Sequence, residues 1–369
     1  MSLFSSPFSK STPNQPLSSS ILSQWLNQFE HPQLIPQWAD TPGLVSLKLD
    51  DSVLITLPFY GQGLQNQLRS WVEEQKKQHQ DLPAIEVVTK VKTMKTAHAT
   101  PVKGVKNIIA ITSGKGGVGK STTAVNFALA LHKLGAKVGL LDADIYGPSV
   151  PIMLGTQGQK PSVVDNKWMQ PVEAHGLYTN SVGYLVAQDD AAVWRGPMAS
   201  KALSQILNET LWPELDYLVI DMPPGTGDIQ LTLSQQIPVT SALVVTTPQD
   251  LALADAVKGV AMFDKVGVPV LGIVENMSYH ICSNCGHHEA LFGQGGAEKM
   301  ARDMDLSLLV QVPLHIDLRS DIDNGCPTVA AQPSSEHSQI YLELAAQVGC
   351  RLFWQGDPVP DAILFTEVK

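Results

Sequence analysis

The stretch GKGGVGKS, residues Gly114 to Ser121, decides the fold that this sequence predicts. It lies between the β-branched run NIIAITS and the run STTAVNFALALHKLG, which has the length and composition of a helix. Glycines between a strand and a helix let backbone N–H groups turn inward around phosphates, at a helix terminus whose dipole favours negative charge. The pattern GxxxxGK followed by serine or threonine, in this setting, predicts a nucleotide-binding P-loop.

Individual positions of this loop have expected roles. Lys120 is expected to reach the β- and γ-phosphates of ATP, and Ser121 is expected to bind Mg²⁺. The residues expected to surround the nucleotide are Gly114, Lys115, Gly116, Gly117, Val118, Gly119, Lys120, Ser121 and Thr122. The alternative is a glycine-rich turn that binds no nucleotide, and the strand and helix on either side disfavour it.

Carboxylates follow two of the neighbouring apolar runs. Asp221 ends DYLVID and leads into MPPGTGD, where P-loop proteins place an acid that holds Mg²⁺ directly or through water. Asp142 and Asp144 follow KVGLL, and the period-2 alternation of a strand points both to the same side. Asp144 is expected to orient the attacking water and Asp142 to belong to the metal shell. Ordinary turn or capping roles remain the alternative for all three.

Outward from the loop, apolar runs alternate with helical stretches. The runs NIIAITS, KVGLLD, DYLVID, SALVVTT, VPVLGIVEN and LSLLVQVPL are apolar on both faces, as strands covered by helices on both sides must be. The predicted fold class is α/β, with a doubly wound, mostly parallel sheet of the P-loop NTPase type over residues 107–355.

The chain before this sheet predicts a second unit. Residues 18–92 alternate as α-β-β-α-β, which indicates a small α+β accessory domain, and a length of 369 residues fits two domains. Residues 1–17 are expected to form a flexible N-terminus, and 93–106 a solvated linker. Residues 356–369 are expected to form a C-terminal tail.

The charge balance and the N-terminus exclude some partners. Lys and Arg number 25 against 35 Asp and Glu, a formal net charge of -10, which disfavours nucleic-acid binding and stable membrane association. The polar start has no signal-like apolar segment, and no run of about 18 apolar residues follows it. The sequence thus predicts a soluble, cytoplasmic protein.

Two of the four cysteines are paired in sequence. HICSNCGHHE, residues 280–289, places Cys282 and Cys285 three positions apart, whereas Cys350 is expected in a helical core and Cys326 in a loop. A thiolate site for zinc or an iron–sulfur cluster usually needs four ligands, and two per chain make four in a symmetric homodimer. The residues leave three possibilities open: a shared cluster, a dithiol redox pair, and zinc bridging two chains. The nearby histidines His280, His287 and His288 are candidate ligands for such a zinc site.

The loop segment KGGVGKS resembles the signature of the deviant Walker-A ATPases, the MinD/ParA-like group. DADIYGPS, WRGPMASKAL, DMPPGTGD, VVTTPQDLALADA, VENMS and the CxxC pair follow in that order. Together they resemble the Mrp/ApbC family of iron–sulfur cluster carrier ATPases over about residues 103–350. The front unit is similar, by position and topology, to the small domain of bacterial members. It contains no cysteine and supplies no thiolate ligand.

This resemblance implies specific functions. Lys115 is expected to reach the partner's nucleotide across a homodimer, and Asn276 to contact adenine at the carboxyl edge of the sheet. Cys282 and Cys285 of two copies are expected to hold a [4Fe-4S] cluster, received from assembly scaffolds and passed to apo iron–sulfur proteins. Two rivals are a MinD/ParA-type positioning switch, for which the tail lacks a basic amphipathic character, and a cluster-dependent redox enzyme.

Overall fold

The computed structural model describes residues 19–79, 82–97, 100–185, 196–282 and 284–360. The expected flexible N-terminus, residues 361–369 and the first two residues of WRGPMASKAL lie outside these ranges. Within the described residues, nine strands form one sheet in the order β13-β12-β11-β4-β10-β5-β9-β8, with β14 also pairing β12. Its strands are β4 Val105–Thr112, β5 Val138–Asp142, β8 Val172–Ala174, β9 Leu177–Ser181, β10 Leu215–Asp221, β11 Ser241–Thr246, β12 Val270–Ile281, β13 His288–Glu289 and β14 Leu308–Leu314.

The sheet is parallel at its centre and antiparallel at two short edge pairs. The six predicted runs form β4, β5, β10, β11, β12 and β14, and all pairings among these six strands are parallel. The pairs β8–β9 and β12–β13 are antiparallel. The predicted doubly wound, mostly parallel α/β fold is therefore confirmed.

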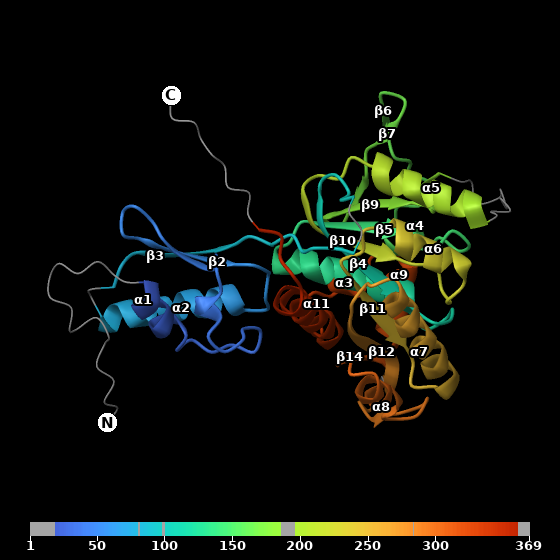
Figure 1. Ribbon diagram of the computed structural model, residues 1–369. Helices are drawn as coiled ribbons and strands as arrows, with labels where there is room; N and C mark the ends of the chain where they lie inside the picture. The colour runs from blue at the N-terminus through green and yellow to red at the C-terminus, as the bar shows by residue number, and fades with distance from the viewer. Residues whose placement is uncertain (1–18, 80–81, 98–99, 186–195, 283, 361–369) are drawn as a thin grey trace.

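Helices cover both faces of this sheet (Figure 1). Ile109 and Ile111 of β4 pack with the helices of one face, and Ile108 and Ala110 pack with those of the other, because successive strand residues point to opposite sides. The first face carries α3 Lys120–Leu134 and α11 Glu336–Gln355, and the second carries α5 Gly196–Glu209, α6 Asp228–Gln236 and α7 Asp250–Lys265. The shorter helices are α4 Val150–Met153, α8 Gly296–Asp303, α9 Ile316–Asp323 and α10 Thr328–Ala331.

Several short strands were not predicted. β8, β9 and β13 extend the sheet, and a separate hairpin joins β6 Val163–Val164 to β7 Trp168–Met169. β8, β9 and β13 are two to five residues long and contain polar residues, and β6 and β7 have only two residues each, so all five lack the apolar run that identified the central strands. In the described part of the chain, no helix is long and apolar enough to span a bilayer.

The N-terminal unit has its elements in the predicted order. They are α1 Ser19–Leu26, the short helix η1 Trp38–Asp40, β1 Val45–Leu47, β2 Val53–Leu57, α2 Leu64–Gln78 and β3 Ile85–Thr89. β1 and β2 are antiparallel and β2 and β3 parallel, with the turn between β1 and β2 at Asp50 and Asp51, where Asp51 has φ 61. Helix α2 packs on this sheet through Leu64, Leu68 and Val72.

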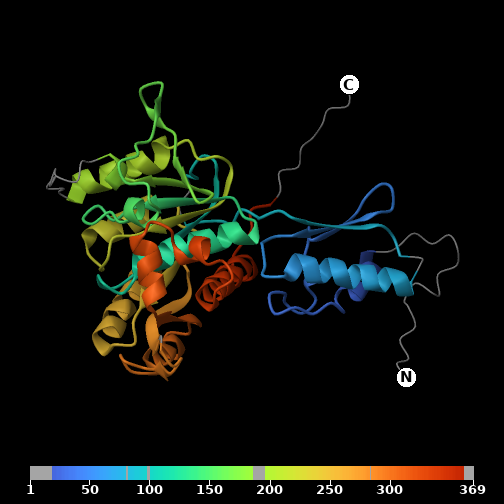
Figure 2. The same cartoon turned by 180° about the vertical axis from the view of Figure 1, so that it is seen from behind.

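The small unit sits against the ends of α3 and α11 at the amino edge of the large sheet (Figure 2). Phe59 is fully buried, with its ring centroid 6.3 Å from that of Phe353 and 6.1 Å from that of Trp354. The Trp354 indole donates to the Gln33 carbonyl oxygen across the seam, at 2.9 Å. Buried side chains of both units thus form one continuous core.

The predicted solvated linker over residues 93–106 is wrong for its first part. Met94 is buried and forms a bridge with Pro358, while the Lys95 N–H donates to the Asp357 carbonyl and the Val359 N–H to the Thr93 carbonyl, both at 2.8 Å. β4 also begins at Val105, inside the predicted linker. The partner of this segment lies at the other end of the chain, so local periodicity gave no sign of the pairing.

Candidate functional site

The P-loop joins the end of β4 to the start of α3. Gly117 and Gly119 have φ 81 and φ 84, in the left-handed region that favours glycine. A Cβ atom on Gly116 or Gly117 would meet nothing within 4 Å, so the backbone there borders open space. On the other side of the loop, a Cβ on Gly114 would overlap the backbone of Asp255 at helix α7. The loop is thus anchored at its first glycine and open where phosphates would enter.

Four predicted site residues meet at the base of this loop. The buried Lys120 Nζ lies 2.5 Å from Asp221 Oδ1, 3.2 Å from Ser121 Oγ and 3.7 Å from Asp144 Oδ2. Thr122 and Ser121 are partly exposed in the first turn of α3. Burial raises the pKa of Asp144, and the opposing charge of Lys120 limits that rise.

The carboxylate of Asp221 fits the predicted metal site. Asp221 is fully buried at the end of β10, and its Oδ2 has no hydrogen-bond partner among the described residues. A buried carboxylate oxygen without a donor is costly, and Mg²⁺ or a water bound to Mg²⁺ would satisfy it. Ser121 Oγ lies close to the same lysine, so the oxygen ligands that P-loop proteins offer Mg²⁺ are present here.

Asp142 holds the loop that follows β5. Its Oδ1 accepts the Asp144 N–H at 3.1 Å, and its Oδ2 accepts the Val150 N–H at 3.1 Å and the Ser181 hydroxyl at 3.0 Å. Burial, followed by the charge of Asp221, raises the pKa of Asp142 to about 7. In this structure the carboxyl therefore orders the loop that carries Asp144, and its expected place in a metal shell stays a prediction.

Asn276 is hydrogen-bonded to the backbone of the P-loop. Its Nδ2 donates to the Val118 carbonyl at 2.8 Å, and a Cβ on Gly119 would overlap that same nitrogen. Both Asn276 and Val118 are buried. Sequence reasoning placed Asn276 at the correct edge of the sheet but did not identify this contact, and its expected contact with adenine stays a prediction.

Glu275 is a site residue that the sequence analysis missed. It is 1% exposed on β12 and accepts hydrogen bonds from the Ser278 hydroxyl, from Gln311 Nε2 at 2.7 Å and from the Ala297 N–H at 3.4 Å. These bonds tie β12 to β14 and to the start of α8. A charged residue within an otherwise apolar run was the available signal.

Lys115 lies at the outer side of the P-loop. Its side chain is partly exposed and makes no hydrogen bond or ion pair with any residue that the structure describes, while its carbonyl accepts the Ser113 hydroxyl at 2.8 Å. The cation is thus free to meet a group outside its own chain. Its expected reach to a partner's nucleotide stays a prediction.

The cysteine pair lies at the tip of a β-hairpin. β12 continues past Asn276 to Ile281 and pairs with β13, with Ile281 opposite His288. Cys282 is partly buried and Cys285 exposed, and their turn is closed by the Cys282 N–H donating to the His287 carbonyl at 2.9 Å. Donation by the backbone N–H groups of Asn284 and Cys285, and by the Cys285 thiol, lowers the pKa of Cys282. The hairpin therefore places two thiol groups side by side, with that of Cys285 exposed.

The remaining cysteines lie where the sequence placed them. Cys350 is buried in α11, where burial raises the pKa of its thiol, and Cys326 is partly buried in the loop after α9. Near the hairpin, the exposed His288 stacks on Tyr279 with centroids 5.0 Å apart.

Comparison with known proteins identifies the family. A family model of the ParA group, described as NUBPL iron-transfer P-loop NTPase, matches residues 104–349. The chain belongs to this family. The matched residues include the cysteine hairpin as well as the P-loop, and the predicted resemblance is confirmed.

Relatives extend the match beyond the P-loop half. The iron-sulfur cluster carrier protein of Haemophilus influenzae is 56% identical over 354 residues, covering 94% of this chain and 96% of its own length. The iron-sulfur cluster carrier protein of Escherichia coli K12 is 65% identical over 279 residues, which cover 75% of this chain and 76% of the Escherichia protein. The Haemophilus match spans most of the small unit as well.

A solved structure supports the fold. A nucleotide-binding protein from Archaeoglobus fulgidus, in complex with ADP, is 36% identical with a TM-score of 0.57. The match covers 64% of this chain and 93% of the Archaeoglobus chain. The P-loop NTPase fold of this family member is thereby shared with a protein that holds a nucleotide.

Proposed function

We propose that this chain is an ATP-hydrolysing carrier that binds a [4Fe-4S] cluster between two copies of itself and passes it to apo-proteins. The cysteine hairpin is the observation that carries the proposal. The partly buried Cys282 and the exposed Cys285 lie together at its tip, and Cys326 and Cys350 lie on other elements. A cluster held by four thiolates needs a second pair, which a two-fold related copy would supply. The names of the Haemophilus and Escherichia relatives agree with this cargo.

The nucleotide site supports ATP hydrolysis. Ser121 and Asp221 would hold Mg²⁺, which would neutralise charge on the phosphates. Lys120, now paired with Asp221, would turn to the β- and γ-phosphates, and Asp144 beside it would orient the attacking water. Lys115, without a partner in the described part of its own chain, would reach the nucleotide of the second copy and stabilise developing negative charge there.

Strand β12 offers a path between the two sites. Asn276 on this strand holds the Val118 carbonyl of the P-loop, and the strand ends directly before Cys282. A P-loop rearranged by nucleotide would therefore move the strand that carries the hairpin. We infer that hydrolysis changes how firmly the cluster is held, and that assembly scaffolds load the cluster while apo iron–sulfur proteins receive it.

Anaerobic reconstitution tests the cargo site. The wild-type chain is expected to gain visible absorption and to bind about four iron and four sulfide ions per dimer. Cys285→Ser is expected to gain neither the absorption nor the bound iron and sulfide. Cys326→Ser is the matched control and should keep them. Colourless protein that retains zinc, or a monomer with a full complement of sulfide in sedimentation, would contradict the proposal.

A transfer assay tests the nucleotide link. Cluster transfer to an apo-protein is expected to respond to ATP in the wild-type chain and not in Lys120→Ala. Equal transfer rates for both proteins, with and without ATP, would show that hydrolysis and cluster transfer are unconnected.

A further inference from the structure

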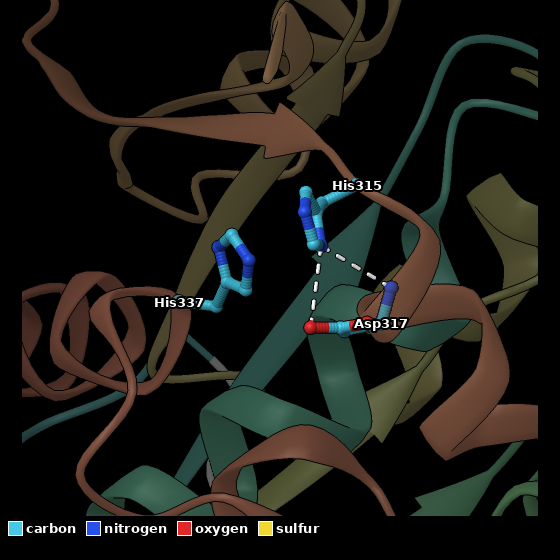
Figure 3. Close-up of side chains that lie close together, drawn as sticks. All are labelled: His315, Asp317 and His337. Atoms are coloured by element: carbon cyan, nitrogen blue, oxygen red, sulfur yellow. Dashed lines mark hydrogen bonds and ion pairs between the residues drawn. The ribbon is translucent and has the colours of Figure 1, made fainter. Parts of the chain in front are cut away.

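A second group of metal-binding side chains lies at the carboxyl end of β14, apart from the P-loop and from both thiols. His315, Asp317 and His337 each offer one ligand atom, and these atoms lie within 4.8 Å of one another. His315 is the N-cap of α9, Asp317 stands in its first turn, and His337 lies at the start of α11 (Figure 3). A strand end and two helix starts thus bring their polar side chains to one point.

One edge of this group already has the spacing that a metal needs. His315 Nδ1 lies 3.5 Å from Asp317 Oδ2, and two ligands bound at about 2.1 Å to a tetrahedral ion lie about 3.4 Å apart. The Asp317 N–H donates to the same Nδ1 at 3.2 Å, so this nitrogen accepts a hydrogen bond through the lone pair that a bound metal would take over. The His337 ring faces it, with centroids 4.7 Å apart (Figure 3). Since the ligand atoms of the group lie within 4.8 Å of one another, a shift of His337 by no more than about 1.4 Å would give the same spacing.

His337 provides an independent reason to expect a ligand. The residue is 7% exposed, its Nδ1 is buried without a partner, and its ring makes no hydrogen bond within the described ranges. A buried imidazole that bonds to nothing is costly and rare in native proteins. Burial, and after it the neighbouring His315, lower the pKa of His337.

The charge around the group also favours a cation. The carboxylates of Asp317, Glu336 and Asp321 all act electrostatically on His337. Asp321 is already hydrogen-bonded to Thr328 and Gln332. Among the described residues, no lysine or arginine forms an ion pair with Asp317 or Glu336, so their negative charge is not balanced by a contact within the chain.

We propose that His315, Asp317 and His337 bind one divalent transition-metal ion of the zinc or ferrous type. Two imidazoles and a carboxylate are the donor set that holds Zn²⁺ or Fe²⁺ with positions left open for water or another ligand. Leu314, directly before His315, pairs with His280 of β12. The ion would therefore sit at the base of the hairpin that carries Cys282, as a site separate from the cluster and with ligands from a single chain.

Cobalt titration tests this site without interference from the hairpin thiols of Cys282 and Cys285. The full chain carrying Cys282→Ser and Cys285→Ser, stripped with chelator and free of nucleotide, is titrated with Co²⁺, whose visible absorption reports its coordination. We expect saturable Co²⁺ binding that includes about one ion per chain at this site. His337→Phe and Asp317→Asn should each lower the affinity for that Co²⁺ ion about 10- to 100-fold. His287→Gln, which alters an exposed histidine of the hairpin, is the control and should bind as the parent does.

Two results would overturn the proposal. One is the absence of saturable Co²⁺ binding by the chain that lacks the two hairpin thiols. The other is unchanged binding in both Asp317→Asn and His337→Phe relative to the His287→Gln control. Asp317 has a side chain that is 46% exposed, and its amide replacement keeps the shape, so this variant stays informative even if a change at the buried His337 disturbs folding.

Discussion

Replacing Asp142 by asparagine is expected to change how the stability of the nucleotide-free protein depends on pH. The pKa of this carboxyl is about 7 in the folded chain, against an ordinary value of 3.8. Because the folded value is the higher one, the folded state holds the proton more tightly between these pH values. Its contribution to stability is therefore full below about pH 4 and is lost as the pH rises towards 7.

The magnitude follows from the size of this difference. At about 1.4 kcal/mol for each pKa unit, proton linkage to Asp142 removes roughly 2 to 3 kcal/mol of the free energy of unfolding between about pH 5 and pH 8. The full burial of the residue means that solvent screening does not reduce this figure. Asparagine has no proton to lose, so the Asp142→Asn variant is expected to gain that amount relative to wild type over the same interval.

Urea unfolding at the two pH values, in chelator and without nucleotide, measures this change. Ser181→Ala is the matched control, because it removes one hydrogen bond to Asp142 and leaves the carboxyl in place. This control should keep the wild-type fall in stability. If the difference between Asp142→Asn and wild type is the same at both pH values, the buried carboxyl is not the source of the pH dependence and the reasoning fails.

Gly119→Ala places an alanine at φ 84, which costs about 1 to 2 kcal/mol of backbone strain, and its Cβ overlaps the Asn276 side chain. A fluorescent-nucleotide titration should therefore show ATP bound at least about tenfold more weakly. Gly43→Ala has a similar φ of 83 and nothing nearby, so it should leave ATP affinity unchanged, and equal affinities in the two variants would refute the P-loop contact. Asn276→Ala loses the hydrogen bond to the Val118 carbonyl, at about 1 kcal/mol, and the same titration should show roughly fivefold weaker binding. Phe59→Ala should lower stability by about 3 to 5 kcal/mol in a single calorimetric transition, whereas two separate transitions would show that the core is not continuous across the seam.

Much of the nucleotide site could be predicted from local sequence. Gly117 and Gly119 have the left-handed backbone that a phosphate loop requires, and Lys120, Asp144 and Asp221 lie together because parallel strands end at the same edge of a sheet. The central strands were identified because both of their faces are covered, which makes each an unbroken apolar run.

The rest depends on contacts between distant parts of the chain. The bond from Asn276 to the Val118 carbonyl joins residues on separate elements, and no local pattern identifies its acceptor. The linker prediction failed for the same reason, since Met94 is buried by residues near the C-terminus. His337 looked like one more residue of a helix, and the sequence analysis gave it no role, because its neighbours His315 and Asp317 are brought to it by the tertiary fold.

The pairing of residues 93–95 with 357–359 has a mechanical consequence. A connection made of one strand allows rotation about its own axis, whereas two strands lying side by side resist twisting and bend about one direction. The polypeptide enters and leaves the nucleotide-binding half through this double stem. The small unit is therefore expected to keep one orientation against the ends of α3 and α11, because neither the paired segments nor the shared core lets it swivel.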